Sequence, residues 1–120
     1  MPENRELTES ENEILSECQA QIEDDVYFIA RPSSFVVFRA PTRAEIQRFK
    51  SIVIDEKKNA AARANADWEL CKSVVIYPKG AEREKLFDRR PMLQTDVAGE
   101  ALAIASDSEM KSAKKFEIAT

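Results

Sequence analysis

The sequence predicts an α+β fold: a helix-rich single domain with a β-hairpin near the N-terminus and about four to five helices. Two β-rich runs flank a Pro/Ser turn within residues 26–39, and apolar residues recur at helical spacing through most of the remaining chain. The chain has 120 residues, of which 43% are apolar and 33% charged. A chain of this size and composition can bury a core as one domain, and no repeat or linker divides it.

The first segment, residues 1–25, is an acidic N-terminal helix or arm. It carries nine acids and one base, a net charge of −8, whereas the remaining residues carry 13 acids and 17 bases, a net charge of +4. Thr8 and Glu11 have the spacing of a capping box, and Leu15, Cys18 and Ile22 follow on one helical stripe with Ile14. We therefore expect a helix over about residues 10–23. The apolar stripe indicates that this helix packs on the rest of the domain. Because the stripe is narrow and lies near a terminus, an arm that can detach stays open as an alternative.

The core domain, residues 26–105, begins with the hairpin. Residues 26–30 and 35–39 are the expected strands, and residues 31–34 the turn. Neither strand alternates polar with apolar residues: Phe35 and Val37 must point to one face, and Val36 and Phe38 to the other. Both faces therefore need cover. The chain's own helices could cover both, or a partner or second subunit could cover one.

Helices are expected next. Thr42 and Glu45 form a second capping box after Pro41, which predicts a helix to about residue 58 with Phe49 on its apolar stripe. A further stripe contains Trp68 and Cys71. The pattern does not decide between one helix and two over residues 43–77, and we favour two with a mobile joint. β-branched residues predominate in residues 74–77, so this segment could form a short strand instead of the end of a helix.

The last part of the core predicts two more helices. Residues 81–87 suit a short helix, and Pro91 can open the final one, whose stripe begins at Leu93. Gly99 interrupts that helix, which indicates either close helix packing or no structural need. Residues 106–120 are rich in Ser, Lys and Glu and are expected to be a flexible tail.

The composition excludes several kinds of catalytic site. The chain contains no histidine, so it cannot by itself build a Ser-His-Asp, Cys-His or His-metal arrangement. Gly80 and Gly99 are the only glycines, too few for a phosphate-binding loop, and Cys18 and Cys71 are too few for a zinc site and look like inert buried thiols. We therefore expect no enzymatic activity, no cofactor and no metal.

The charged clusters and the lengths of the apolar runs limit the kinds of partner that the sequence predicts. The acids Asp55, Glu56, Glu82, Glu84 and Asp88 lie among lysines and arginines, as expected of a solvated surface. A basic region surrounds Phe49, but we do not expect nucleic-acid binding, because the protein is acidic overall and carries no recognised motif. No apolar run approaches the roughly 20 residues of a membrane span. The N-terminus lacks a signal sequence, which predicts a cytoplasmic protein.

The order of elements resembles that of the tail assembly chaperones of long-tailed bacteriophages over about residues 26–105. Four segments carry the resemblance, in chain order: Phe35-Val36-Val37-Phe38, then Arg39-Ala40-Pro41-Thr42 opening a helix, then Trp68 through the Val-rich segment that ends at Pro78, and the helix start after Arg89-Arg90-Pro91. The resemblance implies a non-enzymatic protein of the host cytoplasm that binds the tape measure protein and assists recruitment of the tail tube protein. Many members of that family also have a frameshifted longer form.

A chaperone of this kind needs an apolar surface, and the second face of the hairpin is the candidate. The predicted protein-binding residues are Phe28, Phe35, Val37, Phe38 and Phe49. If Phe35 and Val37 face outward, charged replacements would weaken binding and leave the fold intact. Three alternatives stay open: a structural tail or virion component, a secretion-type effector chaperone, and a small enzyme that uses only carboxylates, lysines or thiols. The sequence also leaves open whether the chain forms homo-oligomers.

Overall fold

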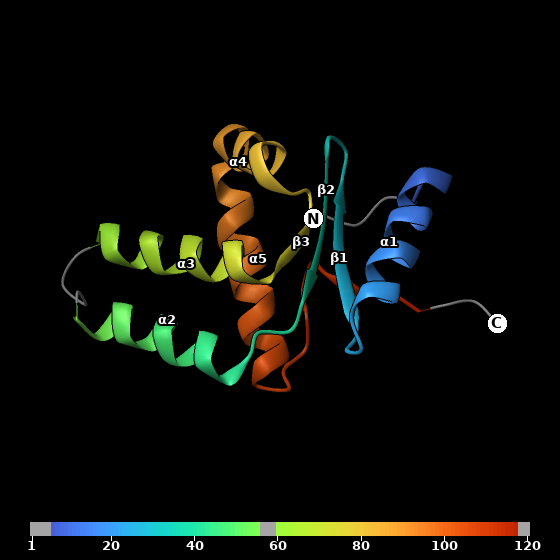
Figure 1. The fold of residues 1–120 in the computed structure, drawn as a ribbon. Coiled ribbons are helices and arrows are strands. Elements are labelled where there is room, and N and C mark those ends of the chain that lie inside the picture. The colour runs from blue at the N-terminus through green and yellow to red at the C-terminus, as the bar shows by residue number, and fades with distance from the viewer. Residues whose placement is uncertain (1–5, 56–59, 118–120) are drawn as a thin grey trace.

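The computed structural model describes residues 6–55 and 60–117. Within these residues, five helices and one four-stranded antiparallel sheet form an α+β domain, which confirms the predicted fold class (Figure 1). The helices are α1 (Glu9–Gln21), α2 (Arg43–Asp55), α3 (Ala60–Val74), α4 (Gly80–Arg89) and α5 (Pro91–Ala105). The strands are β1 (Val26–Arg31), β2 (Ser34–Arg39), β3 (Val75–Tyr77) and β4 (Lys114–Lys115), in the sheet order β3-β2-β1-β4.

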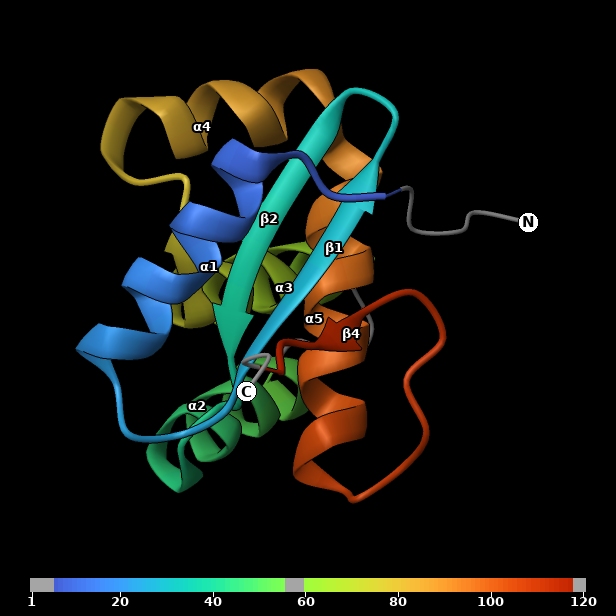
Figure 2. The same ribbon diagram turned by 90° about the vertical axis from the view of Figure 1, so that its right-hand side faces the viewer.

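The β1–β2 hairpin lies between α1 on one face and the remaining helices on the other (Figures 1 and 2). Its register pairs Val26 with Arg39 and Arg31 with Ser34, so the turn is two residues long rather than the four expected. Ile29, Val36 and Phe38 belong to the apolar cluster shared with α3 and α5. The other face of the hairpin contributes to a separate cluster with Leu15 and Cys18 of α1. The opposite orientations predicted for successive β2 residues are therefore confirmed.

Helix α1 begins as the sequence predicts. The backbone N–H of Glu11 donates to Thr8 Oγ1 at 3.1 Å, and the backbone N–H of Thr8 donates to Glu11 Oε1 at 2.9 Å. This reciprocal pair satisfies two N–H groups that the first helical turn would leave without partners. Leu15 and Cys18 are buried on the face that meets the hairpin. The N-terminal helix thus packs on the body.

The start of α2 is joined to the end of β2 by an ion pair. The two guanidinium nitrogens of Arg39 donate to the two carboxylate oxygens of Glu45, each at 2.8 Å. Arg39 Nη2 also donates to the carbonyl of Ser73 at the end of α3, at 2.7 Å. Glu45 meanwhile accepts from the backbone N–H of Thr42 at 2.8 Å, which completes the second capping box. One bidentate pair therefore connects β2, α2 and α3.

Helices α2 and α3 are two antiparallel helices rather than one, as we favoured (Figure 1). The joint predicted between them falls on residues 56–59, which lie outside the described part. Helix α3 ends at Val74 and the chain continues directly as β3, so the alternative of a short strand is confirmed for residues 75–77, while Val74 belongs to the helix. The rings of Trp68 on α3 and Phe87 on α4 meet edge to face, with their centroids 5.6 Å apart.

The C-terminal segment differs from the flexible tail expected. Residues Lys114 and Lys115 pair with β1, and the backbone N–H of Phe116 donates to the carbonyl of Val26 at 2.7 Å. The loop before β4 is anchored by the buried carboxylate of Glu100, which accepts from the backbone N–H of Ser112 at 2.7 Å. Residues 112–116 thus form long-range backbone bonds, of which the polar composition gave no sign.

Helix α5 runs through Gly99 without interruption. Gly99 is exposed, and a Cβ placed there would meet no described atom within 4 Å apart from its own helix backbone and chain neighbours. Close packing therefore does not explain this glycine. We predict that Gly99→Ala raises the free energy of unfolding by about 1 kcal/mol, because alanine loses less backbone entropy in a helix.

Urea denaturation of the wild type and the variant would measure this gain. Gly80→Ala is the matched control: Gly80 has a φ of +56°, so the same added methyl should lower stability there. A loss of stability at Gly99 would contradict the prediction.

The Arg39–Glu45 pair predicts acid sensitivity. Hydrogen bonds from the Arg39 guanidinium hold the pKa of Glu45 below its ordinary value. A carboxylate whose pKa is depressed by folding stabilises the protein above its unfolded pKa, near about 4.3, and this stabilisation is lost as the pH falls through the folded pKa. We predict that Glu45→Gln lowers the free energy of unfolding at pH 7 by about 1 to 2 kcal/mol and flattens its decline below about pH 5.

The free energy of unfolding as a function of pH, from urea titrations at each pH, checks this. Glu13→Gln removes an exposed carboxylate of α1 and should leave the profile as in the wild type. Identical pH profiles for wild type and Glu45→Gln would refute a stabilising role of the pair.

Candidate functional site

The five residues predicted to bind protein are all buried. Phe28, Phe35 and Val37 lie in the cluster under α1, with exposed fractions of 8%, 9% and 0%. Phe38 and Phe49 lie on the opposite side of the hairpin, in the cluster with α3 and α5. Phe35 and Val37 therefore do not meet the condition of facing outward: they face α1.

The cover on the second hairpin face comes from the chain itself. Leu15 is fully buried and Cys18 nearly so against the hairpin, and Ile14 and Ile22 are partly buried beside them. Of the two alternatives that the sequence left open, the one with the chain's own helices on both faces is the one that the structure has. The apolar stripe of the acidic helix is thus used inside the domain.

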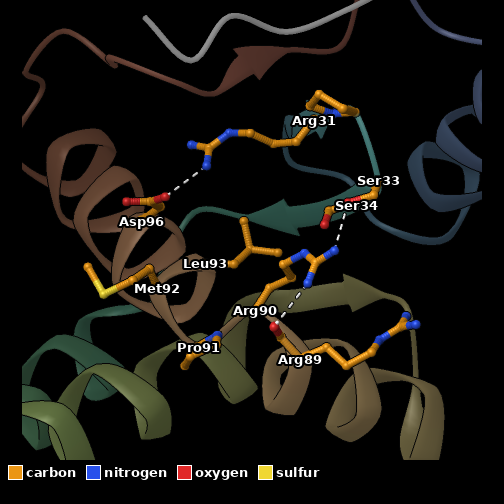
Figure 3. A pocket seen from close by; sticks show the side chains of 10 residues that line it. Arg31, Ser33, Ser34, Arg89, Arg90, Pro91, Met92, Leu93 and Asp96 are labelled. Atoms are coloured by element: carbon orange, nitrogen blue, oxygen red, sulfur yellow. Dashed lines mark hydrogen bonds and ion pairs between the residues drawn. The ribbon is translucent and has the colours of Figure 1, made fainter.

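A surface site forms instead around the hairpin turn. A cavity of about 410 Å³ lies between the turn and the first residues of α5. Its lining residues are Arg31, Pro32, Ser33, Ser34, Arg89, Arg90, Pro91, Met92, Leu93 and Asp96 (Figure 3). Arg90 reaches from the start of α5 to the turn, where its Nη2 donates to Ser33 Oγ at 3.2 Å. Arg31 Nη1 pairs with Asp96 Oδ2 at 3.0 Å, which links β1 to α5.

A second cavity of about 460 Å³ adjoins the first on the other side of the turn. It shares Ser33, Ser34 and Arg89 with the first and is further lined by Phe35, Tyr77, Pro78, Lys79, Glu82 and Leu86. The two cavities adjoin at these shared residues, between the turn, α4 and the start of α5. We call them together the turn groove.

Two large, exposed apolar side chains line the turn groove. Among the described residues, Met92 and Tyr77 are the two large apolar side chains left exposed, at 69% and 36%. Met92 lines one cavity and Tyr77 the other. Scattered exposed apolar residues are ordinary on a protein surface, but two beside one concave site indicate a binding surface.

Charge distinguishes the turn groove further. Four cations line it, Arg31, Lys79, Arg89 and Arg90, against the carboxylates of Glu82 and Asp96. Asp96 is paired with Arg31, and Glu82 lies 4.0 Å from Lys85 outside the groove. In the part of the chain that the structure describes, Lys79, Arg89 and Arg90 have no carboxylate partner. Cations therefore outnumber carboxylates in the lining of the groove.

The two thiols are poor nucleophiles. Burial raises the pKa of Cys71 to about 12 and also raises that of Cys18. Both thiols are therefore protonated at neutral pH, when a reactive cysteine would be a thiolate. Neither forms a disulfide.

The other clusters considered from the sequence do not converge on a site. Glu84 lies 3.7 Å from Arg83, and over residues 6–55 and 60–117 no group of three or more metal-ligating side chains occurs. Asp55 and Glu56, like Lys57, Lys58 and Arg63 of the basic region, lie outside the residues whose side chains are described. None of the described helices is long and apolar enough to cross a membrane.

The turn groove was not predicted from the sequence. Its residues come from three stretches, 31–35, 77–86 and 89–96, which the sheet and the α4–α5 corner bring together. One local signal was present: Arg89, Arg90, Pro91 and Met92 place two cations and an apolar side chain at a helix start, where a core residue is not required. Comparison with known proteins adds nothing to this geometry, because no protein-family model, curated protein or solved structure matches the chain.

The burial of Val37 predicts the effect of charged replacements. Val37→Asp should lower the free energy of unfolding by about 3 kcal/mol or more, because a carboxylate would be placed among apolar side chains without a partner. Circular dichroism and urea denaturation measure the change. Ser16→Asp, on the exposed side of α1, is the control and should alter stability by less than about 0.5 kcal/mol. A folded Val37→Asp variant of unchanged stability would show that this face is open after all.

Proposed function

We propose that the protein is a non-enzymatic tail assembly chaperone of a long-tailed bacteriophage, which works in the cytoplasm of the host. It binds the tape measure protein and assists the recruitment of the tail tube protein. The partner is held at the turn groove rather than at the hairpin face, whose side chains are buried in the domain.

One observation carries the proposal that the protein acts by binding. Met92 and Tyr77, the exposed large apolar side chains of the described residues, lie in the same groove. A client chain with exposed apolar faces needs such a surface to remain soluble. Beside the groove, Arg90 and Ser33 join α5 to the turn, and Arg31 and Asp96 join α5 to β1.

The size of the groove suits a transient complex. Two adjoining cavities of about 410 and 460 Å³ admit a few side chains of a partner, not a whole domain face. Small contact areas give weak or short-lived association, and an assembly chaperone must release its client when the tail forms.

The family resemblance supports the same function. The segments that carry it fall on β2, on the start of α2, on the passage from α3 to β3, and on the first turn of α5. The last two contribute Tyr77, Pro78 and Pro91 to the turn groove. Phe35 of the first segment also lines the groove, so three of the four segments meet at the candidate site.

Co-expression with the tape measure protein tests the proposal. We expect the two chains to co-purify, and Met92→Glu to reduce the recovered tape measure protein at least about fivefold, because it places a charge where an apolar contact is expected. Ala105→Glu, at the other end of α5, makes the same kind of change on an exposed residue and should leave recovery unchanged. Absence of any co-purification would reject the chaperone function.

The same system separates the alternatives. A chaperone should be absent from purified phage particles, whereas a structural tail component should be abundant in them. Co-purification with the N-terminal segment of a secreted effector, and not with a tape measure protein, would indicate a secretion-type chaperone. A gene for a very long helical protein immediately downstream would support the tail assembly function.

A further inference from the structure

We propose that the turn groove binds an acidic segment of the client that carries a large apolar side chain. The inference rests on the proposed function for the identity of the client, and on the groove itself for the chemistry of the segment. It identifies the partner by two properties at once, negative charge and an apolar anchor.

The negative charge of the partner is inferred from cations of the groove that pair with no carboxylate of the described residues. The guanidinium of Arg90 bonds only neutral acceptors in the described structure, Ser33 Oγ at 3.2 Å and the carbonyl of Arg89 at 3.2 Å. Arg89 lines both cavities and Lys79 one of them, and within residues 6–55 and 60–117 neither pairs with a carboxylate. Elsewhere on this domain, Arg39 pairs with Glu45 and Arg48 pairs with Glu69. A carboxylate from a partner would complete the set at the turn.

The apolar side chain of the partner is inferred from the apolar residues that line the turn groove. Met92 projects at 69% exposure beside the buried Leu93, and its flexible thioether can adapt to a partner's side chain. In the second cavity, Tyr77 lies beside Phe35, with ring centroids 6.0 Å apart, and Leu86 also lines the wall. An apolar side chain of the client can therefore insert between the cations. Its insertion expels water, which strengthens the attraction between those cations and the client's carboxylates.

The same features argue against nucleic acid as the occupant. Phosphate backbones are bound along tracks of cations, with aromatic faces free for base stacking. Here the cations come from the end of β1, the two ends of α4 and the start of α5, Asp96 and Glu82 line the groove with them, and the ring of Tyr77 already contacts Phe35. An acidic protein segment fits this arrangement better than a polyanion.

Binding of a designed peptide to the full-length protein tests the inference. The probe is a fluorescent amphipathic peptide of glutamate and leucine; its matched partner has lysine in place of every glutamate, and a single-stranded oligonucleotide is the third probe. Fluorescence anisotropy should show binding of the glutamate peptide that weakens as salt rises, and no binding of the lysine peptide.

Variants locate the site. Arg89→Glu and Arg90→Glu should each weaken binding of the glutamate peptide about tenfold, and Met92→Ser about threefold or more. Lys50→Glu makes the same change in net charge on the exposed side of α2 and should leave the affinity within about twofold of the wild type. Circular dichroism of each variant should match the wild type, since all four side chains are exposed.

The possible results are distinct. Equal binding of both peptides, tighter binding of the oligonucleotide, or affinities unchanged by Arg89→Glu and Arg90→Glu would each overturn the inference. If the tape measure protein co-purifies equally with Arg89→Glu and wild type, the chaperone function stands and the acidic docking mode fails. If the glutamate peptide binds at the groove while no tape measure protein ever co-purifies, the docking chemistry stands and the proposed function fails.

Discussion

The hairpin of β1 and β2 carries apolar side chains on both faces, and the arrangement of the other elements depends on covering them. Val26, Phe28 and Val37 need one cover, and Ile29, Val36 and Phe38 need another. The acidic helix α1 supplies the first and the helices after β2 supply the second (Figure 2). Because a two-stranded ribbon is barely stable alone, burial of both faces is what makes the hairpin a fixed support for the rest of the domain.

The two ends of this buried hairpin have different roles. At the end where β2 leaves the sheet, Arg39 holds Glu45 and the carbonyl of Ser73, so α2 and α3 start and end at fixed places. At the turn, the chain projects against α4 and α5, and Arg90 and Arg31 tie it to α5. At the first end, the charges of Arg39 and Glu45 are paired with each other within the domain. The second leaves cations and apolar side chains facing solvent, which is why the candidate site lies there.

The turn groove contains exposed apolar and cationic side chains, which do not contribute to the hydrophobic core. Met92 is exposed, Arg89 pairs with no carboxylate among the described residues, and Arg90 bonds only neutral acceptors there. Met92 and Arg89, which do not join α5 to the turn, can serve a partner without weakening the fold. The modest size of the groove fits reversible binding. The cations in its lining favour one orientation of the partner and also increase its affinity.

The sequence by itself determined the local elements: both capping boxes, the opposite facing of Phe35 and Val36, the start of α5 at Pro91, and the fold class. These depend on interactions between residues at most four positions apart, or on alternation along one strand. Only the tertiary structure decided which helix covers which hairpin face, that residues 114–115 join the sheet, and that the turn meets α4 and α5 in a groove. Those outcomes depend on contacts between distant segments, and an apolar side chain such as Val37 has the same local pattern whether its cover is α1 or another protein.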